Sequence, residues 1–472
     1  MSFNNCFKRL NIEDINSGPK SSKKTLSLFE LVFIGVGMIV GSGIFVLTGI
    51  ASCLYAGPAV IISFLLSGFV SLCSAMCYAE FASMIKNGGN SYSYLQISLG
   101  ELPAYIVGML TIAGYFLGVI SVILGWSRYF MSFLSDTMFQ IDFVTSFLIK
   151  EELFFKSKLF LSLINLPALF IVLFFTLILY YGIKISSFFT LIFLLIKMLT
   201  LVCFIIVGIF YITPENWIPF VPRNHGAFGT FGISGIFMGA SILFIAFNGI
   251  DAVCSASQET KNPQKNTSIG ILITVLIVLV IYILTSIVLT GVVNYKSLCG
   301  SEPFYIVLKK INLIWFKYFI AIGSLVGLTA SIFISFYTIV KMLSSIGNDG
   351  FLPACLIELH YKNKTPYRII ILIGMLISII ILIFAFYNIV VFSSIFILIS
   401  LVAVCSSSIY MRYKFPNIKR GFKCPLMPFI PLVTIFLSCY IIFSNSLETL
   451  SVTFLFVVVL VIFYFFFKLF KN

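Results

Sequence analysis

Long apolar stretches alternate with short polar, charged or Gly- and Pro-bearing segments along almost the whole chain. A helix needs roughly 20 mainly apolar residues to cross a bilayer, so these stretches can be counted as crossings. About twelve are predicted by this rule, starting near Leu28, Gly57, Leu102, Leu159, Phe188, Ser234, Ile269, Phe316, Ile369, Val390, Pro428 and Val452. The pattern predicts an all-α polytopic protein embedded in a lipid bilayer.

The composition agrees with this pattern. Of the 472 residues, 60% are hydrophobic and 10% charged, against about 25% charged in a soluble domain. Residues 1–26 are polar and lack the apolar core and cleavage site of a secretory signal, so we expect a cytosolic tail. The frequent Ile, Phe, Lys and Asn suit an AT-rich genome, and we expect the inner membrane of a bacterium.

The net charge of +14 follows the predicted topology. Lys and Arg in segments predicted to be cytosolic outnumber those in outer segments, as the positive-inside rule requires. Orientation therefore explains the basicity, with both termini cytosolic, and no nucleic-acid partner is indicated.

No cofactor or metal site is predicted. The eleven cysteines include no CxxC pair, and Cys73 and Cys77 are interpreted as small packing residues on one helix face. His225 and His360 are the only histidines and lie in loops expected on opposite sides of the membrane. Without a catalytic triad or a phosphate loop, an enzyme is disfavoured.

Two spans are interrupted by poor helix formers. The first contains Gly41-Ser42-Gly43 near its middle, which favours unwinding, although glycines at such spacing also allow close helix packing. The sixth contains the turn-type dipeptide Asn248-Gly249. These spans begin two successive groups of five, where inverted-repeat transporters place discontinuous helices. Unwound helix ends offer amides to a carboxylate and carbonyls to an amine, a combination suited to an α-amino acid.

The chain resembles the amino acid–polyamine–organocation (APC) superfamily of transporters, and within it the cationic amino acid transporter branch. The resemblance extends from about Phe29 to Arg412. It rests on the order and spacing of several strings: GVGMIVGSGIFVLTG, AGPAVIISFLLSGFVSL, CYAEFASMI, GGNSYSYLQISLGELPAYIVG, GWSRYF, PENWIPFVP, FIAFNGIDAV, ETKNPQK and NDGFLP.

The resemblance implies a leucine-transporter-type fold of two inverted five-helix repeats with broken helices 1 and 6. The expected parts are a cytosolic tail (1–26), the two repeats (27–213 and 234–411), and two peripheral helices with a short tail (412–472). It also implies that amides of Ser42, Gly43 and Ile44, next to Gly41, bind the substrate carboxylate. Carbonyls of Ile39, Ile245, Ala246 and Asn248 would take the amine, with Phe247 packing nearby. Asn248 either caps the broken helix or reaches the substrate side chain.

Lys197 lies near the middle of the fifth span. A charged amine at that depth usually faces a cavity and marks an ion or proton path; the alternative is a side chain that reaches the membrane surface. The position matches a lysine that replaces a bound sodium ion in proton-coupled relatives. We therefore expect Lys197 to lose and regain a proton in each transport cycle.

Other charges and departures bear on gating and specificity. Glu80, Asp251 and Lys341 are expected in structural or gating ion pairs, because unpaired charges there are costly. Many relatives carry a glutamate where this chain has Gly114. After helix 6 they carry two acidic residues, whereas this chain has Gln258-Glu259. The family's name is thus a poor guide to specificity, and neutral and cationic amino acids both remain candidates.

We expect a proton-coupled amino acid importer, with an amino acid, protons and the lipid bilayer as partners, that works as a monomer. An exchanger or facilitator on the same fold would use the same site, with Lys197 only as a fixed counter-charge. A non-transporting amino acid sensor would bind ligand without flux.

Overall fold

The computed structural model describes residues 26–85, 89–137, 165–182, 187–224, 226, 228–256, 260–300, 302–361, 363, 365–383 and 386–471. Within these ranges the chain is helical and has no strand; one isolated bridge joins Leu26 and Thr260. The predicted all-α architecture is confirmed. The predicted N-terminal tail lies outside the described residues almost entirely.

The elements follow one another as short and long helices. The first half forms α2 (Leu28–Ile39), η2 (Gly43–Leu47), α3 (Thr48–Ala51), η3 (Ser52–Ala56), η4 (Gly57–Ala59), α4 (Val60–Met84), α5 (Ser91–Ser98), α6 (Glu101–Thr137), α9 (Leu166–Tyr180), α10 (Ser187–Ile209) and η5 (Pro214–Trp217). The second half forms α11 (Gly232–Leu243), η6 (Phe244–Phe247), α12 (Ile250–Ala256), α13 (Pro263–Val292), η8 (Tyr295–Ser297), α14 (Pro303–Ile311), α15 (Ile314–Ile346), η9 (Gly347–Phe351), α16 (Ala354–Ile357), α17 (Tyr367–Ile383), α18 (Phe386–Lys414), α19 (Phe429–Phe443) and α20 (Leu447–Lys471).

Many of these helices have the length and apolarity of membrane spans. Among the described residues, seven helical stretches qualify, the first of which runs from Leu28 to Met84, and four shorter helices are also apolar. Apart from Leu159, which lies outside the described residues, each predicted span start falls in a helix or directly before one. Large apolar side chains such as Phe170, Phe436 and Phe454 are exposed on α9, α19 and α20, as a lipid-facing surface requires.

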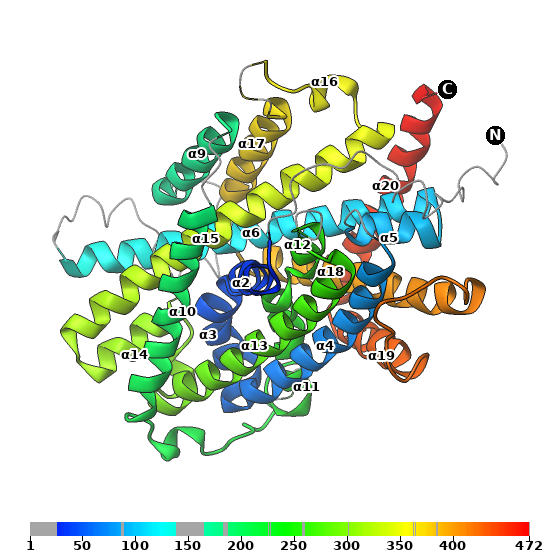
Figure 1. Ribbon diagram of the computed structural model, residues 1–472. Helices are drawn as coiled ribbons and strands as arrows, with labels where there is room; N and C mark the ends of the chain where they lie inside the picture. The colour runs from blue at the N-terminus through cyan, green and yellow to red at the C-terminus, as the bar shows by residue number, and fades with distance from the viewer. Residues whose placement is uncertain are drawn as a thin grey trace.

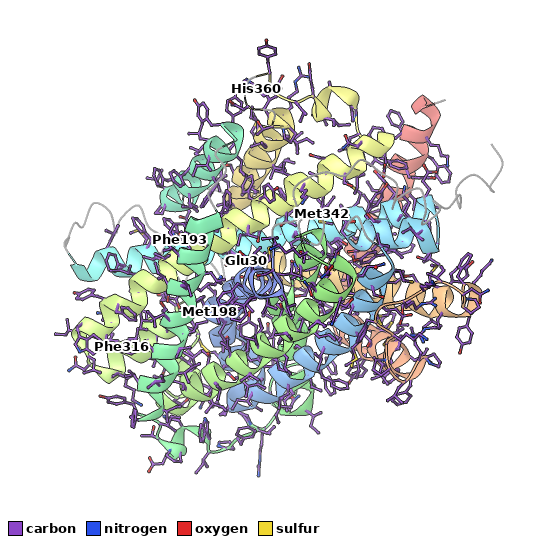
Figure 2. The ribbon with its side chains drawn as sticks, in the orientation of Figure 1. Glu30, Phe193, Met198, Phe316, Met342 and His360 are labelled. Carbon is purple, nitrogen blue, oxygen red and sulfur yellow. A yellow bond between two sulfur atoms is a disulfide. The ribbon has the colours of Figure 1, made fainter. Side chains whose placement is uncertain are left out.

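The first helix occupies the centre of the bundle. α2 contacts α10, α12, α13 and α15, which surround it in Figure 1. It begins at a capping box: the Glu30 carboxylate accepts from the Ser27 amide at 2.7 Å, and the Glu30 amide donates to Ser27 Oγ at 3.3 Å. Glu30, labelled in Figure 2, thus marks where this central helix starts.

A buried ion-pair cluster fastens the segment between α18 and α19 to the end of α4. Glu80 lies 2.6 Å from Arg412 Nη2 and 3.0 Å from Arg420 Nε, and it accepts from the Cys424 amide at 2.9 Å. The ion pair expected for Glu80 is therefore present. Because two guanidinium groups and an amide surround one carboxylate, the loop is held in a defined position.

Candidate substrate-binding site

Helix 1, the name used here for α2, η2, α3 and η3 together, is interrupted near its middle. α2 ends at Ile39, Val40 is extended (φ −71°, ψ 98°), and the helix resumes with Ser42 already helical (φ −59°, ψ −25°). The predicted unwinding of all of Gly41-Ser42-Gly43 is therefore wrong in extent, since only Gly41 of the three lies in the break. Ser42 tolerates the helical conformation, so the amides of Ser42, Gly43 and Ile44 begin the C-terminal half of helix 1, where the first amides lack intrahelical partners.

Helix 6, which comprises α11, η6 and α12, is interrupted at the predicted dipeptide. Asn248 is extended (φ −71°, ψ 128°), and Gly249 has a φ of +149°. That φ favours glycine, and a Cβ there would also lie 2.7 Å from Ile39 Cγ1 of helix 1. The glycine at 249 therefore serves both the break and the close approach of the two helices.

The two breaks lie against each other. A Cβ on Gly43 would lie 2.1 Å from Ala246 Cβ and 2.5 Å from Ala246 Cα, so the backbones are in direct contact. The structure thus brings together every residue that the sequence predicts for the substrate: Ile39, Gly41, Ser42, Gly43, Ile44, Ile245, Ala246, Phe247 and Asn248 are buried or nearly so. Their role in binding remains a prediction.

A small cavity with both polar and apolar lining residues adjoins the helix 6 break. Its volume is about 20 Å³, room for about one water molecule. Of the predicted residues, Phe247 and Asn248 line it; the rest of the lining comes from Phe244 of η6, from Gly249 in the break, and from α4, α6, α12 and α18. A cavity of this size is too small for an amino acid.

Lys197 is completely buried on α10 and binds the N-terminal half of helix 1. Its Nζ donates to the Gly37 carbonyl at 2.8 Å and to Ser331 Oγ at 2.7 Å, and Ser331 Oγ in turn donates to the Val40 carbonyl at 3.0 Å. The amine does not reach the membrane surface, which removes that alternative. Lys197 therefore joins α10, α15 and helix 1 immediately before the break.

Gly114 lies where α6 meets α18. A Cβ on Gly114 would lie 2.7 Å from Ile397 Cγ1, and the Gly114 carbonyl accepts from Ser393 Oγ at 2.7 Å. The space that a side chain at 114 would use is filled by an isoleucine. A side chain at position 114 would therefore meet an apolar group first.

Asp251 fastens the inner half of helix 6 to the short helix α5. It accepts hydrogen bonds from the Ser91 amide, at 2.8 Å, and from Ser91 Oγ. The expectation of an ion pair is wrong for Asp251 in the described part of the chain, because the first residue of α5 supplies one amide and one hydroxyl that stabilise the carboxylate without a cation. The gating role predicted for Lys341 on α15 stays a prediction, and Gln258-Glu259 lies outside the described residues.

Three further features had no counterpart in the sequence analysis. The Tyr282 hydroxyl, from α13, lies 3.0 Å from the Ile39 carbonyl oxygen and 2.9 Å from that of Ala246. Ser42 Oγ lies 3.1 Å from Ser121 Oγ. The third is a disulfide. The sequence did contain a signal for Tyr282: a tyrosine within an apolar span indicates a hydrogen-bond partner, because a buried phenol usually has one.

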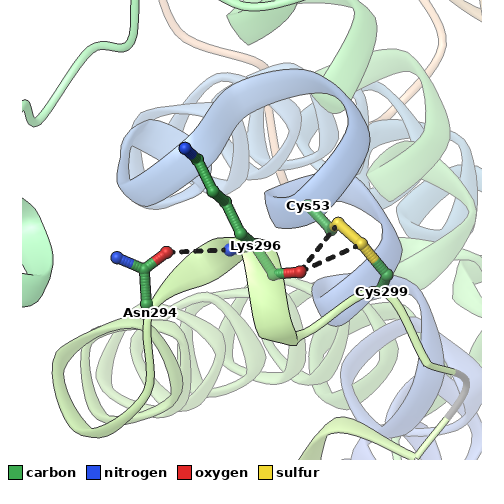
Figure 3. Close-up of a disulfide and its surroundings, with 4 residues drawn as sticks. All are labelled: Cys53, Asn294, Lys296 and Cys299. Carbon is green, nitrogen blue, oxygen red and sulfur yellow. Dashed lines mark hydrogen bonds between the residues drawn. A yellow bond between two sulfur atoms is a disulfide. The ribbon is translucent and has the colours of Figure 1, made fainter.

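The disulfide joins Cys53, at the C-terminal end of helix 1, to Cys299, between η8 and α14 (Figure 3). Their Cα atoms are 5.1 Å apart across a sequence separation of 246. Cys73 and Cys77 are free and buried, in agreement with a packing role. Among the described residues no group of three or more His, Cys, Asp and Glu could hold a metal, and His360 lies far from the central helix in Figure 2, whereas His225 is outside the described residues.

A bundle of apolar membrane helices, with two interrupted helices in contact at its centre and a buried lysine beside them, defines a multi-pass membrane transporter rather than an enzyme. The comparison with known families agrees. The chain belongs to the amino acid permease family, whose model matches residues 26–467.

Characterised relatives support this assignment. The chain is 34% identical over 448 residues to the branched-chain amino acid permease BcaP of Bacillus subtilis (94% of this chain, 93% of the relative). It is 34% identical over 443 residues to the methylthioribose transporter of the same organism (93% and 92%). It is 31% identical over 362 residues to the vacuolar cationic amino acid transporter 4 of Arabidopsis thaliana (76% and 58%).

Proposed function

We propose that this protein imports neutral amino acids across a bacterial inner membrane, coupled to protons. The fold is of the leucine-transporter type with twelve crossings, two inverted repeats (27–213 and 234–411) and two peripheral helices (412–472). The contact between two interrupted helices, each the first of its group of five, supports this arrangement.

The substrate binds where the breaks meet. The amides of Ser42, Gly43 and Ile44 take the carboxylate, since they begin a half-helix whose dipole favours an anion. The carbonyls of Ile39 and Ala246, which lie within reach of one hydroxyl group, take the amine. When the inner half-helices move apart, the space between these groups admits a zwitterion.

A neutral side chain fits the surroundings best. Ile397 fills the space beside Gly114, and glycine has no carboxylate that could pair with a cationic side chain. Asp251 is engaged by Ser91 at the end of α5. The similarity to a branched-chain amino acid permease points in the same direction.

Lys197 couples transport to protons. The observation that carries the proposal is its complete burial with two neutral partners, the Gly37 carbonyl and Ser331 Oγ. Removal from water disfavours the charged amine, and neutral partners compensate only in part. Loss of its proton weakens both hydrogen-bond contacts and so releases the inner half of helix 1.

The orientation places both termini in the cytosol. The excess of Lys and Arg in the corresponding segments supports it. Cys53 and Cys299 then lie on the outer side, where disulfides persist.

Uptake into proteoliposomes tests the proposal. Labelled leucine and arginine are compared with and without an imposed pH gradient, for the wild type and for Lys197→Met. We expect gradient-driven leucine uptake in the wild type and uptake that no longer responds to pH in the variant. Arginine uptake in preference to leucine would refute the neutral substrate. A Lys197→Met variant that still follows the gradient would refute the coupling role, and flux that ignores the gradient but accelerates with internal leucine would indicate an exchanger.

A further inference from the structure

Tyr282 connects the two breaks through a single hydroxyl group. It lies on α13, completely buried, and its oxygen is 3.0 Å from the carbonyl oxygen of Ile39 and 2.9 Å from that of Ala246. Its ring packs against Phe64 and Phe247, with centroids 5.3 Å and 5.2 Å away. The aromatic contacts hold the hydroxyl at this position.

One hydroxyl group cannot donate to both carbonyls at the same time. A phenol carries one hydrogen, so at any moment it donates to only one of the two carbonyls. Both carbonyls belong to backbone at or beside a helix break. A primary ammonium group has three N–H donors and serves both carbonyls at once. An amine is therefore a better partner for this pair than the hydroxyl.

We propose that the Tyr282 hydroxyl takes the place of the substrate's amine in the empty carrier and is displaced by that amine on binding. The inference rests on the proposed function and assigns to Tyr282 the role of a positioning residue that lets the empty protein close. The ligand class it selects is a compound with a primary ammonium group. An empty carrier without this hydroxyl must close over two buried carbonyls that lack their donor, which is costly.

If Tyr282 only links α13 to helices 1 and 6, different results are expected. Tyr129 provides a matched control. Tyr129 is also buried, and its hydroxyl donates to the Phe45 carbonyl of helix 1 at 2.7 Å. That carbonyl lies in the outer half-helix, away from the carbonyl pair. Tyr129→Phe thus removes a comparable hydrogen bond between a tyrosine and helix 1 without altering the proposed amine site.

The test compares Tyr282→Phe, Tyr129→Phe and the wild type in leucine binding to purified protein, in net leucine uptake and in leucine exchange. In Tyr282→Phe only the empty closed form loses a hydrogen bond, so we expect leucine to bind about tenfold more tightly. Net uptake, which needs the empty carrier to return, falls by a similar factor, whereas exchange stays near the wild-type rate. Tyr129→Phe leaves the affinity and the ratio of exchange to net uptake unchanged.

Several results would overturn the inference alone: weaker or unchanged leucine binding in Tyr282→Phe, an equal change in net uptake and exchange, or the same behaviour in Tyr129→Phe. If the wild-type protein transports only by exchange, the affinity comparison decides. A wild type that binds no leucine overturns the proposed function, and the role of Tyr282 with it.

Discussion

The contact between Gly43 and Ala246 sets a steric limit at the proposed site. A methyl group added at Gly43 would lie 2.1 Å from Ala246 Cβ and 2.5 Å from its Cα, against 3.4 Å for an ordinary contact. The Cα belongs to the backbone and cannot rotate away. Helices 1 and 6 must therefore separate by roughly an ångström in Gly43→Ala before the observed closed form can exist.

The cost of this separation can be bounded. Overpacking of a tight interior costs about 1–3 kcal/mol, and tenfold in population corresponds to about 1.4 kcal/mol. If transport passes through this closed form, the initial rate of leucine uptake in Gly43→Ala falls by about 30-fold at the middle of that range. Uptake is measured in proteoliposomes at equal protein content, with thermal unfolding recorded to detect misfolding.

Gly41 provides the control two residues away. The nearest atom to a Cβ there is Ser331 Oγ at 3.4 Å, which is an ordinary contact. We expect Gly41→Ala to transport at nearly the wild-type rate. Wild-type uptake by a well-folded Gly43→Ala protein would refute the reasoning, because the closed form would then not be needed for transport.

Two other predictions concern stability. Replacement of Glu80 by Gln leaves the guanidinium groups of Arg412 and Arg420 without their shared carboxylate, and since breaking a buried pair costs about 3–5 kcal/mol, the melting temperature should fall by several degrees. Loss of the disulfide in a Cys53→Ser, Cys299→Ser double variant frees a long loop in the unfolded chain. The variant should then unfold at a lower temperature than the wild type. Full reduction of the wild type should lower its melting temperature to the same value.

Each of these two stability predictions has a control. Glu358 pairs with Arg368 at 3.0 Å, and both side chains are exposed. Water and salt screen such exposed pairs, so they contribute little, and Glu358→Gln should leave the melting temperature almost unchanged. An equal effect of Glu80→Gln and Glu358→Gln would contradict the importance of the Glu80 cluster. A reductant that lowers the melting temperature of the disulfide-free variant as much as that of the wild type would contradict the second prediction.

The sequence was informative where a single segment determines the outcome. Hydropathy located the helices, because an apolar stretch of span length has few alternatives to a membrane helix. The dipeptide Asn248-Gly249 located the helix 6 break, since its second residue adopts a φ of +149° that favours glycine. The depth of Lys197 within its span likewise indicated a buried amine.

The remaining features depend on residues that are distant in sequence. Tyr282 contacts a carbonyl 243 positions away, and neither residue alone indicates the other. The same holds for Cys53 and Cys299, whose pairing requires helix 1 and the segment after η8 to meet. Asp251 was assigned to an ion pair because its position beside the first turn of α5 could not be inferred from local pattern.

The covalent bond at Cys53 makes the two ends of helix 1 mechanically unequal. Its C-terminal half is anchored to the segment before α14, and the close approach of Gly49 to Leu298, where a Cβ would lie 2.6 Å from the carbonyl oxygen, leaves little room for movement there. The N-terminal half, α2, is held by hydrogen bonds and packing. We therefore expect α2 to pivot at Val40 and Gly41 while the C-terminal half keeps its position.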